Sequence, residues 1–286
     1  MSSGWLRIIF CIVLLTGAVQ AHQEPPKSRE DLEEQRLATE RIRQAGVRTE
    51  LQHKIVYKAD GSEQHQYLAA GNIYDRDGSL RRGSIYDSNG TEIVSVEFVY
   101  DLERELQEQN QCVKDSGCER SVFLYRSDHL VALALDLDKD GNPKARLQYA
   151  YQLGDTVVHL TKRNAAESLL YTIDYCYSPD RQTGHMVRAI KKDPAGKLEL
   201  RTEQSYDSTG LKEKKIYGAD DKLTVRYEYV RRPDGQLLSL KRYAPTGECT
   251  QQMIWEYGAN NLPLRHTTSD GAGHLTYTLE YEYENW

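Results

Sequence analysis

The feature that most constrains this chain is a short repeat in which a tyrosine is followed, four positions later, by a residue suited to a tight turn. The pairs are Tyr57 with Gly61, Tyr74 with Gly78, Tyr86 with Gly90, Tyr206 with Gly210, Tyr217 with Asp221, Tyr243 with Gly247 and Tyr257 with Asn261. Glycine, followed by asparagine and aspartate, best tolerates a positive φ. Such a repeat predicts an architecture before any single residue is interpreted, but it does not identify an activity.

Between these turns the sequence alternates with a period of two. The last such segment places Leu275, Tyr277, Leu279, Tyr281 and Tyr283 on one face and Thr276, Thr278, Glu280, Glu282 and Glu284 on the other. One aromatic or apolar face and one charged face are typical of an antiparallel sheet that is wet on one side. Turn residues recur roughly every 10 to 17 positions, so one strand and one tight turn form each unit.

We therefore expect an all-β domain over residues 51–286, built as a long antiparallel up-and-down meander. The apolar face of so long a sheet must be covered, and its edges attract other strands. Sheet twist curls it, so the predicted fold is an open shell or partial barrel with the tyrosine face inward. The 20 tyrosines against 3 phenylalanines suit a partly wet inner surface.

The amino-terminal region carries an export signal. Arg7 precedes an apolar stretch, and small residues precede a cleavage site after Ala21, so residues 1–21 read as a signal peptide. Residues 22–50 are predicted to be a polar leader and a short helix, capped at Ser28 and ended near Gly46. No later segment approaches the length of a transmembrane helix.

A polar, Gln- and Glu-rich stretch from Asp101 to Gly117 interrupts the pattern. It is compatible with a helix or a long loop, and a break near residues 101–120 would divide the sheet into two blocks. Cys112 and Cys118 flank a polar tip and are expected to form a disulfide in an oxidising compartment, with two free thiols as the alternative. Whether Cys176 and Cys249 pair stays open.

The segments Tyr74-Asp-Arg-Asp-Gly78, Tyr86-Asp-Ser-Asn-Gly90 and Tyr206-Asp-Ser-Thr-Gly210 resemble those of the YD-repeat, or Rhs-type, proteins. Members of that family build long antiparallel sheets that coil into hollow shells, in bacterial secreted and surface proteins and in toxins. The resemblance covers most of the chain after residue 55. It implies a stand-alone relative, because no toxin domain or self-cleaving element is recognisable.

Few residues point to chemistry. Asp136, Asp138 and Asp140 reproduce the opening of a calcium loop, but the positions that follow fail, which favours an ordinary turn. The histidines show no metal-ligand spacing, and His159 and His266 are interpreted as strand-surface residues. No catalytic motif and no cofactor fingerprint occurs, so we expect a non-enzyme without a cofactor.

Candidate binding residues are the aromatic side chains of the last predicted strands. They are Trp255, Tyr257, Tyr277, Tyr281 and Tyr283. Such faces stack on sugars, but the interpretation that the pattern favours is that they fill the concave core.

The leading functional hypothesis is a non-catalytic, exported bacterial protein that binds or scaffolds an unknown protein or glycan partner, in the periplasm or at the cell surface. The net charge of −6 with interspersed signs gives no indication of nucleic-acid binding. One alternative is an outer-membrane β-barrel, favoured by the terminal Trp286 and the tyrosines, although Glu284 and Glu282 share the phase of Trp286. Another is an envelope glycan-hydrolysing enzyme with a hidden carboxylate pair.

Overall fold

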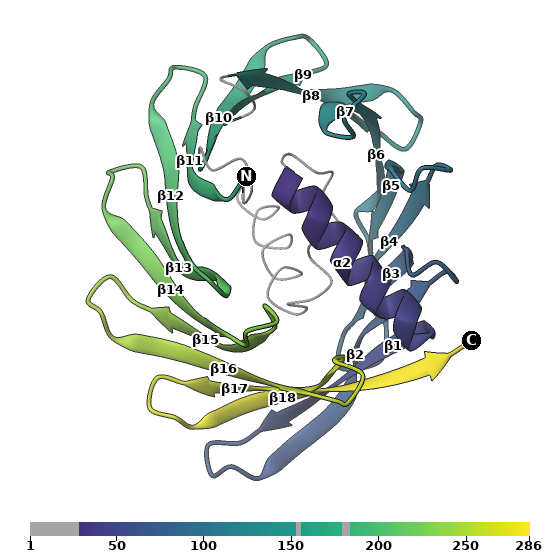
Figure 1. The fold of residues 1–286 in the computed structure, drawn as a ribbon, viewed down its shortest axis with the longest axis vertical. Helices are drawn as coiled ribbons and strands as arrows, with labels where there is room; N and C mark the ends of the chain where they lie inside the picture. The colour runs from purple at the N-terminus through teal and green to yellow at the C-terminus, as the bar shows by residue number, and fades with distance from the viewer. Residues whose placement is uncertain (1–28, 153–155, 179–183) are drawn as a thin grey trace.

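The computed structural model describes residues 29–152, 156–178 and 184–286, which form a barrel with one helix inside the ring of strands (Figure 1). The predicted signal peptide of residues 1–21, the leader and Ser28 lie outside the described residues. The expected helix is present as α2, Arg29–Ala45. Within the described ranges, no helix has the length and apolar character needed to cross a membrane.

The described residues after α2 form 18 strands of a single sheet. Their bounds are β1 Val47–Tyr57, β2 Glu63–Tyr74, β3 Leu80–Tyr86, β4 Glu92–Tyr100, β5 Leu106–Val113, β6 Gly117–Tyr125, β7 Val131–Leu137, β8 Pro143–Gln152, β9 Val157–Asn164, β10 Leu169–Tyr177, β11 Met186–Lys192, β12 Leu198–Asp207, β13 Gly210–Tyr217, β14 Leu223–Arg231, β15 Leu237–Tyr243, β16 Cys249–Tyr257, β17 Pro263–Asp270 and β18 Leu275–Asn285. Each strand pairs with the next in antiparallel fashion, as the meander predicted.

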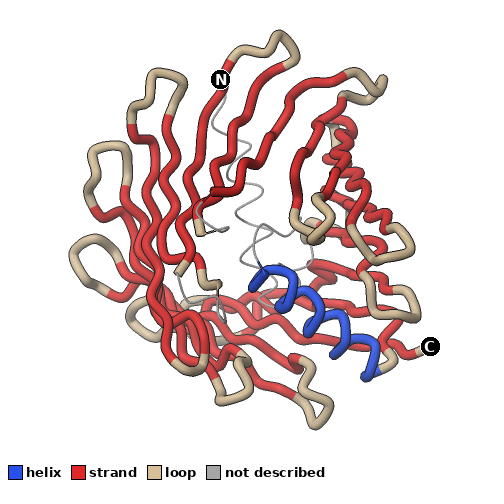
Figure 2. The backbone as a smooth tube through the Cα atoms, turned by 45° about the horizontal axis from the view of Figure 1, so that its top comes forward, coloured by secondary structure: helices blue, strands red, loops and turns tan. Residues whose placement is uncertain are grey.

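The sheet is closed, which corrects the expectation of an open shell or partial barrel. Strand β1 pairs with β2 on one side and with β18 on the other, where Gln52 lies opposite Tyr281. The strands thus run as a wall around the barrel, with hairpins at both ends (Figure 2). Closure removes the two edges that an open meander would expose, and it depends on a pairing between the two ends of the sheet.

The turn prediction is confirmed at every position of the repeat. Gly61, Gly78, Gly90, Gly210, Gly247, Asp221 and Asn261 all have positive φ, from 57° to 117°. The aspartate that often follows the tyrosine stabilises the turn. Asp87 Oδ1, for example, accepts hydrogen bonds from the backbone N–H groups of Asn89 and Thr91, at 2.9 and 3.0 Å. The repeat is therefore turn chemistry, not a ligand set.

The expected break near residues 101–120 does not occur. Asp101 to Glu105 form a tight turn, closed by the Asp101 N–H donating to the Glu105 carbonyl at 3.0 Å, and the polar stretch that follows is strand β5. Cys112 and Cys118 lie directly opposite each other in the next hairpin and form the predicted disulfide, with an S–S distance of 2.01 Å. Polar side chains lie on both faces of β5, because Gln109 and Gln111 are opposite the inner residues Phe98 and Val96, whereas Glu108 and Asn110 take the alternate, outer positions.

The two faces of the wall are distinguished by α2. Ile42 of α2 belongs to one buried cluster with Tyr74, Leu80 and Phe98, so the strand face that carries those residues points into the barrel. We call it the inner face and the alternate positions the outer face. Side chains on the inner, concave face converge and bury one another, which explains why Leu80 and Leu279 are fully buried.

The outer face carries ion pairs across neighbouring strands. Arg82 lies 3.0 Å from Glu97, and Arg265 lies 2.7 Å from Glu280. On β12 to β15 the pairs join into a network in which Arg226 contacts Glu213 at 3.3 Å. Ion pairs thus lie on the outer face, beside exposed apolar side chains such as Ile254.

Candidate functional site

The structure brings the predicted aromatic residues together where the two ends of the sheet meet. Trp255 and Tyr257 lie on β16, and Tyr277, Tyr281 and Tyr283 lie on β18, which pairs with β1. Their side chains occupy the inner face. Together with the inner-face residues of β1, β2 and β17 that they contact, we call this group the seam cluster.

His266 on β17 lies at the centre of the seam cluster, with only 1 % of its surface exposed. This corrects the expectation of a strand-surface histidine. Its ring centroid lies 5.1 Å from that of Trp255 and 5.7 Å from that of Tyr277. Its Nε2 lies 3.2 Å from the Thr268 hydroxyl oxygen, and its Nδ1 lies 3.4 Å from the Tyr281 hydroxyl oxygen. Burial, with the positive charge of Lys54 nearby, lowers the pKa of His266 to about 4, so the ring is neutral.

Lys54 of β1 extends the aromatic part of the cluster. Its Nζ atom lies 4.3 Å from the centroid of the Tyr277 ring, within the range of a cation–π interaction. An inner-face ammonium over an aromatic ring shows that this part of the barrel already accommodates a positive charge.

Glu50 of β1 is the buried carboxyl group of the seam cluster. It lies opposite Tyr283 of β18 and Asn72 of β2. Its oxygens accept hydrogen bonds from Gln52 Nε2 at 2.7 Å, Asn72 Nδ2 at 3.1 Å and the Tyr74 hydroxyl at 3.4 Å. Burial raises the pKa of Glu50, and these hydrogen bonds oppose the rise.

Glu50, Gln52 and His266 were missed as site residues at the level of sequence. A weak signal exists, because Glu50, Gln52 and Lys54 alternate with Leu51 and Ile55. That pattern predicts a strand with its polar face outward, since a polar face normally meets water. The structure places the polar set on the inner face, opposite the tyrosines of β18.

Several inner-face tyrosines, of which Tyr257 belongs to the repeat, have a structural role at one end of the barrel. The hydroxyl groups of Tyr151, Tyr257 and Tyr283 donate to the backbone carbonyls of Val131, Leu237 and Pro263, each 20 residues earlier, at 2.7 to 2.8 Å. Phenylalanine could not make this bond, which explains why tyrosine dominates. Among the predicted binding aromatics, Trp255, Tyr277 and Tyr281 therefore remain the better candidates for ligand contact.

The calcium-like aspartates do not form one site. Asp138 Oδ1 accepts the backbone N–H groups of Asp140 and Asn142, at 2.9 and 2.8 Å, as in an ordinary turn. Asp136 instead lies 2.8 Å from Lys162 Nζ on the inner face. In the described part of the chain, the residues whose ligand atoms gather within 4.8 Å of one another are Glu103, Glu105 and His129, at the surface.

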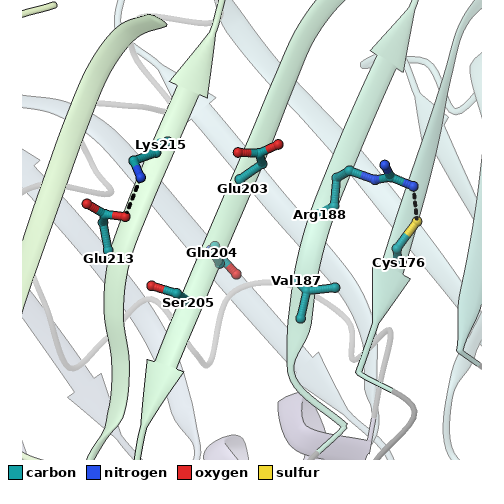
Figure 3. Close-up of a pocket in the computed structure, with 8 residues that line it drawn as sticks. All are labelled: Cys176, Val187, Arg188, Glu203, Gln204, Ser205, Glu213 and Lys215. Carbon is teal, nitrogen blue, oxygen red and sulfur yellow. Dashed lines mark hydrogen bonds and ion pairs between the residues drawn. The ribbon is translucent and has the colours of Figure 1, made fainter.

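A second concave region lies on the outer face of β10 to β13 (Figure 3). Its volume is about 410 Å³, and Cys176, Arg188, Glu203 and Lys215 contribute one side chain from each strand. The Arg188 guanidinium points at the Cys176 thiol, with Nη2 3.8 Å from Sγ. In the part of the chain that the structure describes, Cys176 and Cys249 do not pair with each other and both are free.

Comparisons with known proteins add little. No protein-family profile matches the sequence. No curated protein matches it either. Among solved structures, the TcdB2-TccC3-Cdc42 structure matches with 11 % identity and a TM-score of 0.31, over 80 % of this chain and 14 % of that one.

A porin-like protein from Bacteroides uniformis matches with 11 % identity and a TM-score of 0.40, over 82 % of this chain and 97 % of that one. A porin-like protein from Bacteroides vulgatus matches with 11 % identity and a TM-score of 0.33, over 83 % and 98 %. Thus the chain spans nearly all of the porin-like chains but only 14 % of the toxin chain. Similarity at this level carries no argument about function.

Proposed function

We propose that this chain is an exported, water-exposed β-barrel of the bacterial envelope that binds a ligand or partner at the seam cluster and catalyses no reaction. The observation that carries the proposal is the contrast between the two faces of the wall. Buried aromatic and polar side chains gather on the inner face at the seam, whereas the outer face carries exposed ion pairs. The Tyr-to-turn repeat supports a relationship to YD-repeat proteins.

The outer face supports a barrel that faces water. A barrel in a membrane presents an apolar band to lipid, and a lysine or arginine at the bilayer midplane costs about 2–4 kcal/mol. Here Arg82, Arg226 and Arg265 occupy outer positions within their strands. Several such residues around the wall would make a lipid environment unfavourable.

The inner face supports binding without catalysis. The seam cluster offers aromatic rings for stacking and a set of buried hydrogen-bonding groups. Glycosidases of the common type need two carboxyl groups flanking the bond that is cleaved. Within the described seam cluster, Glu50 is the carboxyl group on the inner face, so we do not propose a hydrolase.

The test is capture of partners from an envelope extract by the wild-type protein and two variants of β16. Trp255→Ala removes an inner ring, and Ile254→Ala is the matched outer control. We expect a protein or glycan to be enriched by the wild type and by Ile254→Ala, and to be lost with Trp255→Ala. Enrichment that is absent, or equal for all three proteins, would contradict the proposal.

An outer-membrane barrel is the second candidate function, and closure of the sheet favours it. Bacterial outer-membrane barrels have an even number of antiparallel strands in up-and-down order, and the described strands fit that description. Carbonate extraction and gel mobility before and after heating separate the two candidates. Retention in the membrane pellet with a heat-dependent mobility shift would establish the second one, whereas release by osmotic shock without detergent supports the first.

A further inference from the structure

Glu50 is a buried carboxyl group without a basic partner. Its hydrogen-bond donors are the amides of Gln52 and Asn72 and the hydroxyl of Tyr74, and among the described residues no lysine, arginine or histidine pairs with it. Buried carboxylates in proteins are normally paired with a positive charge. The Glu50 carboxylate could therefore pair with a cation.

Gln52, beside it on the inner face, has an acceptor with no donor. The side chain is fully buried and its Nε2 donates to Glu50 at 2.7 Å, whereas its Oε1 has no hydrogen-bond partner among the residues that the structure describes. When Glu50 is ionised, turning the amide around would place Oε1 against the carboxylate, so the contact with ionised Glu50 fixes the orientation. The unpartnered acceptor indicates a missing donor next to the carboxyl group.

Tyrosine rings adjoin both groups. Tyr283 lies directly opposite Glu50, and Tyr281 lies directly opposite Gln52, on the neighbouring strand β18. Burial raises the pKa of both tyrosines, and the nearby Glu50 raises it further, so both hydroxyls stay neutral. Neutral aromatic rings near a carboxyl group attract a cation through their faces.

We propose that Glu50 and Gln52 bind the primary ammonium group of a small organic ligand, an inference that rests on the proposed binding function of the seam cluster. One N–H of the ammonium donates to the Glu50 carboxylate and another to Gln52 Oε1, while the tyrosines contact its remaining surface. A quaternary ammonium has no N–H and would leave Gln52 unpartnered. Calcium needs six to eight oxygen ligands, more than this pair provides.

Helix α2 covers the site from one end. Ile42 packs in the same cluster as Tyr74 and Tyr283. The backbone of α2 also lies against the turn after β2, where a Cβ on Gly78 would come within 2.3 Å of the Thr39 carbonyl oxygen. Gly78→Ala is thus expected to displace α2 and to speed ligand entry without touching Glu50 or Gln52.

The experiment is calorimetric titration of the full exported protein with propylammonium chloride, beside tetramethylammonium chloride and calcium chloride. Glu50→Gln and Gln52→Leu test the site, and Glu97→Gln on the outer face is the control. Circular dichroism and thermal unfolding confirm that each variant is folded. We expect propylammonium to bind most tightly, and each of the two site variants to weaken it by about tenfold or more, since each removes a hydrogen bond to a charged group.

Equal propylammonium binding by the wild type and Glu50→Gln would overturn the inference, as would preference for tetramethylammonium or calcium. Absence of propylammonium binding to both the wild type and Gly78→Ala would also overturn it, because the second variant removes slow access as an explanation. Should partner capture still depend on Trp255 in that case, the proposed function stands and only the ligand class fails. Loss of both results would contradict both proposals.

Discussion

The inner and outer faces of the wall are made by the same strands, yet their side chains are in different environments: those inside are buried against one another, and those outside are exposed to water. On β16, Met253 and Trp255 are buried in the barrel, whereas Ile254 between them is 46 % exposed. On β17, His266 is buried next to Trp255, whereas Arg265 pairs with Glu280 outside. Polarity alone therefore does not distinguish the inner face from the outer face. Buried polar groups on the inner face make specific contacts, as His266 does with Thr268, whereas the charged groups outside are exposed to water and form exposed ion pairs.

The largest expected difference between the faces is in packing. Trp255→Ala should lower the free energy of unfolding by about 3–5 kcal/mol, because it removes a buried ring and leaves a cavity. Ile254→Ala, one residue away on the outer face, should change it by no more than about 0.5 kcal/mol. Urea unfolding of both variants measures the contrast, and similar losses would mean that the two faces are assigned wrongly.

His266 should give the barrel a pH dependence. Its pKa in the folded state, about 4, lies below the ordinary 6.5, so its neutral form stabilises the fold above pH 6.5 and that contribution is lost as the pH falls through 4. The difference between these two pKa values corresponds to about 3 kcal/mol in the free energy of unfolding. Urea unfolding from pH 7 to pH 4 should show a smaller loss for His266→Asn than for the wild type. The outer variant Thr267→Asn should lose as much stability as the wild type over this pH range. If His266→Asn loses as much as well, His266 is not the source of the pH dependence.

The inner ion pair on β7 and β9 should matter less than a buried ring but more than a surface pair. Asp136 and Lys162 have side chains only 28 % and 22 % exposed, and Asp136 also accepts from the Ser121 hydroxyl at 2.9 Å. Asp136→Asn should cost about 1–3 kcal/mol, because it leaves the ammonium without its counter-charge. Thermal and urea unfolding measure it against Asp140→Asn in the exposed turn, for which we expect no loss.

The smallest effect belongs to the outer ion pairs. Arg265→Gln breaks the contact with Glu280, whose side chains are 45 % and 39 % exposed, and should cost about 0.2–1 kcal/mol. The loss should shrink as salt rises from low to high ionic strength, because exposed charges are screened. A salt-independent loss of several kcal/mol would show that this part of the outer face is covered by a partner.

Local features of the fold were predictable from the sequence, and long-range ones were not. Gly61, Gly78 and Asp221 were recognised as turn residues because a positive φ is a property of a single residue and its neighbours. Closure was not recognised, because the pairing of Gln52 with Tyr281 joins segments from the two ends of the sheet and leaves no local trace. The polar strand β5 was misread for a related reason: its support comes from β4 and β6.

The candidate site shows the same division. Trp255 and the tyrosines of β18 were found because aromatic residues stand out in an alternating pattern. Glu50 and His266 were missed, since a polar residue is expected to face water and only tertiary contacts reveal that these are buried. The disulfide was found because Cys112 and Cys118 are close in sequence and flank one turn.

The most direct test of the central claim, a water-exposed outer wall around an aromatic interior, is cysteine accessibility along β16. Ile254→Cys and Met253→Cys are each made in a Cys176→Ser, Cys249→Ser background. The outer membrane is first made permeable to the reagent without detergent, and the envelopes are then labelled with a membrane-impermeant maleimide. The account predicts rapid labelling at position 254 and protection at 253 until the protein is unfolded. Protection of 254 that is lifted by detergent, with the fold retained, would place the outer face in lipid and contradict it.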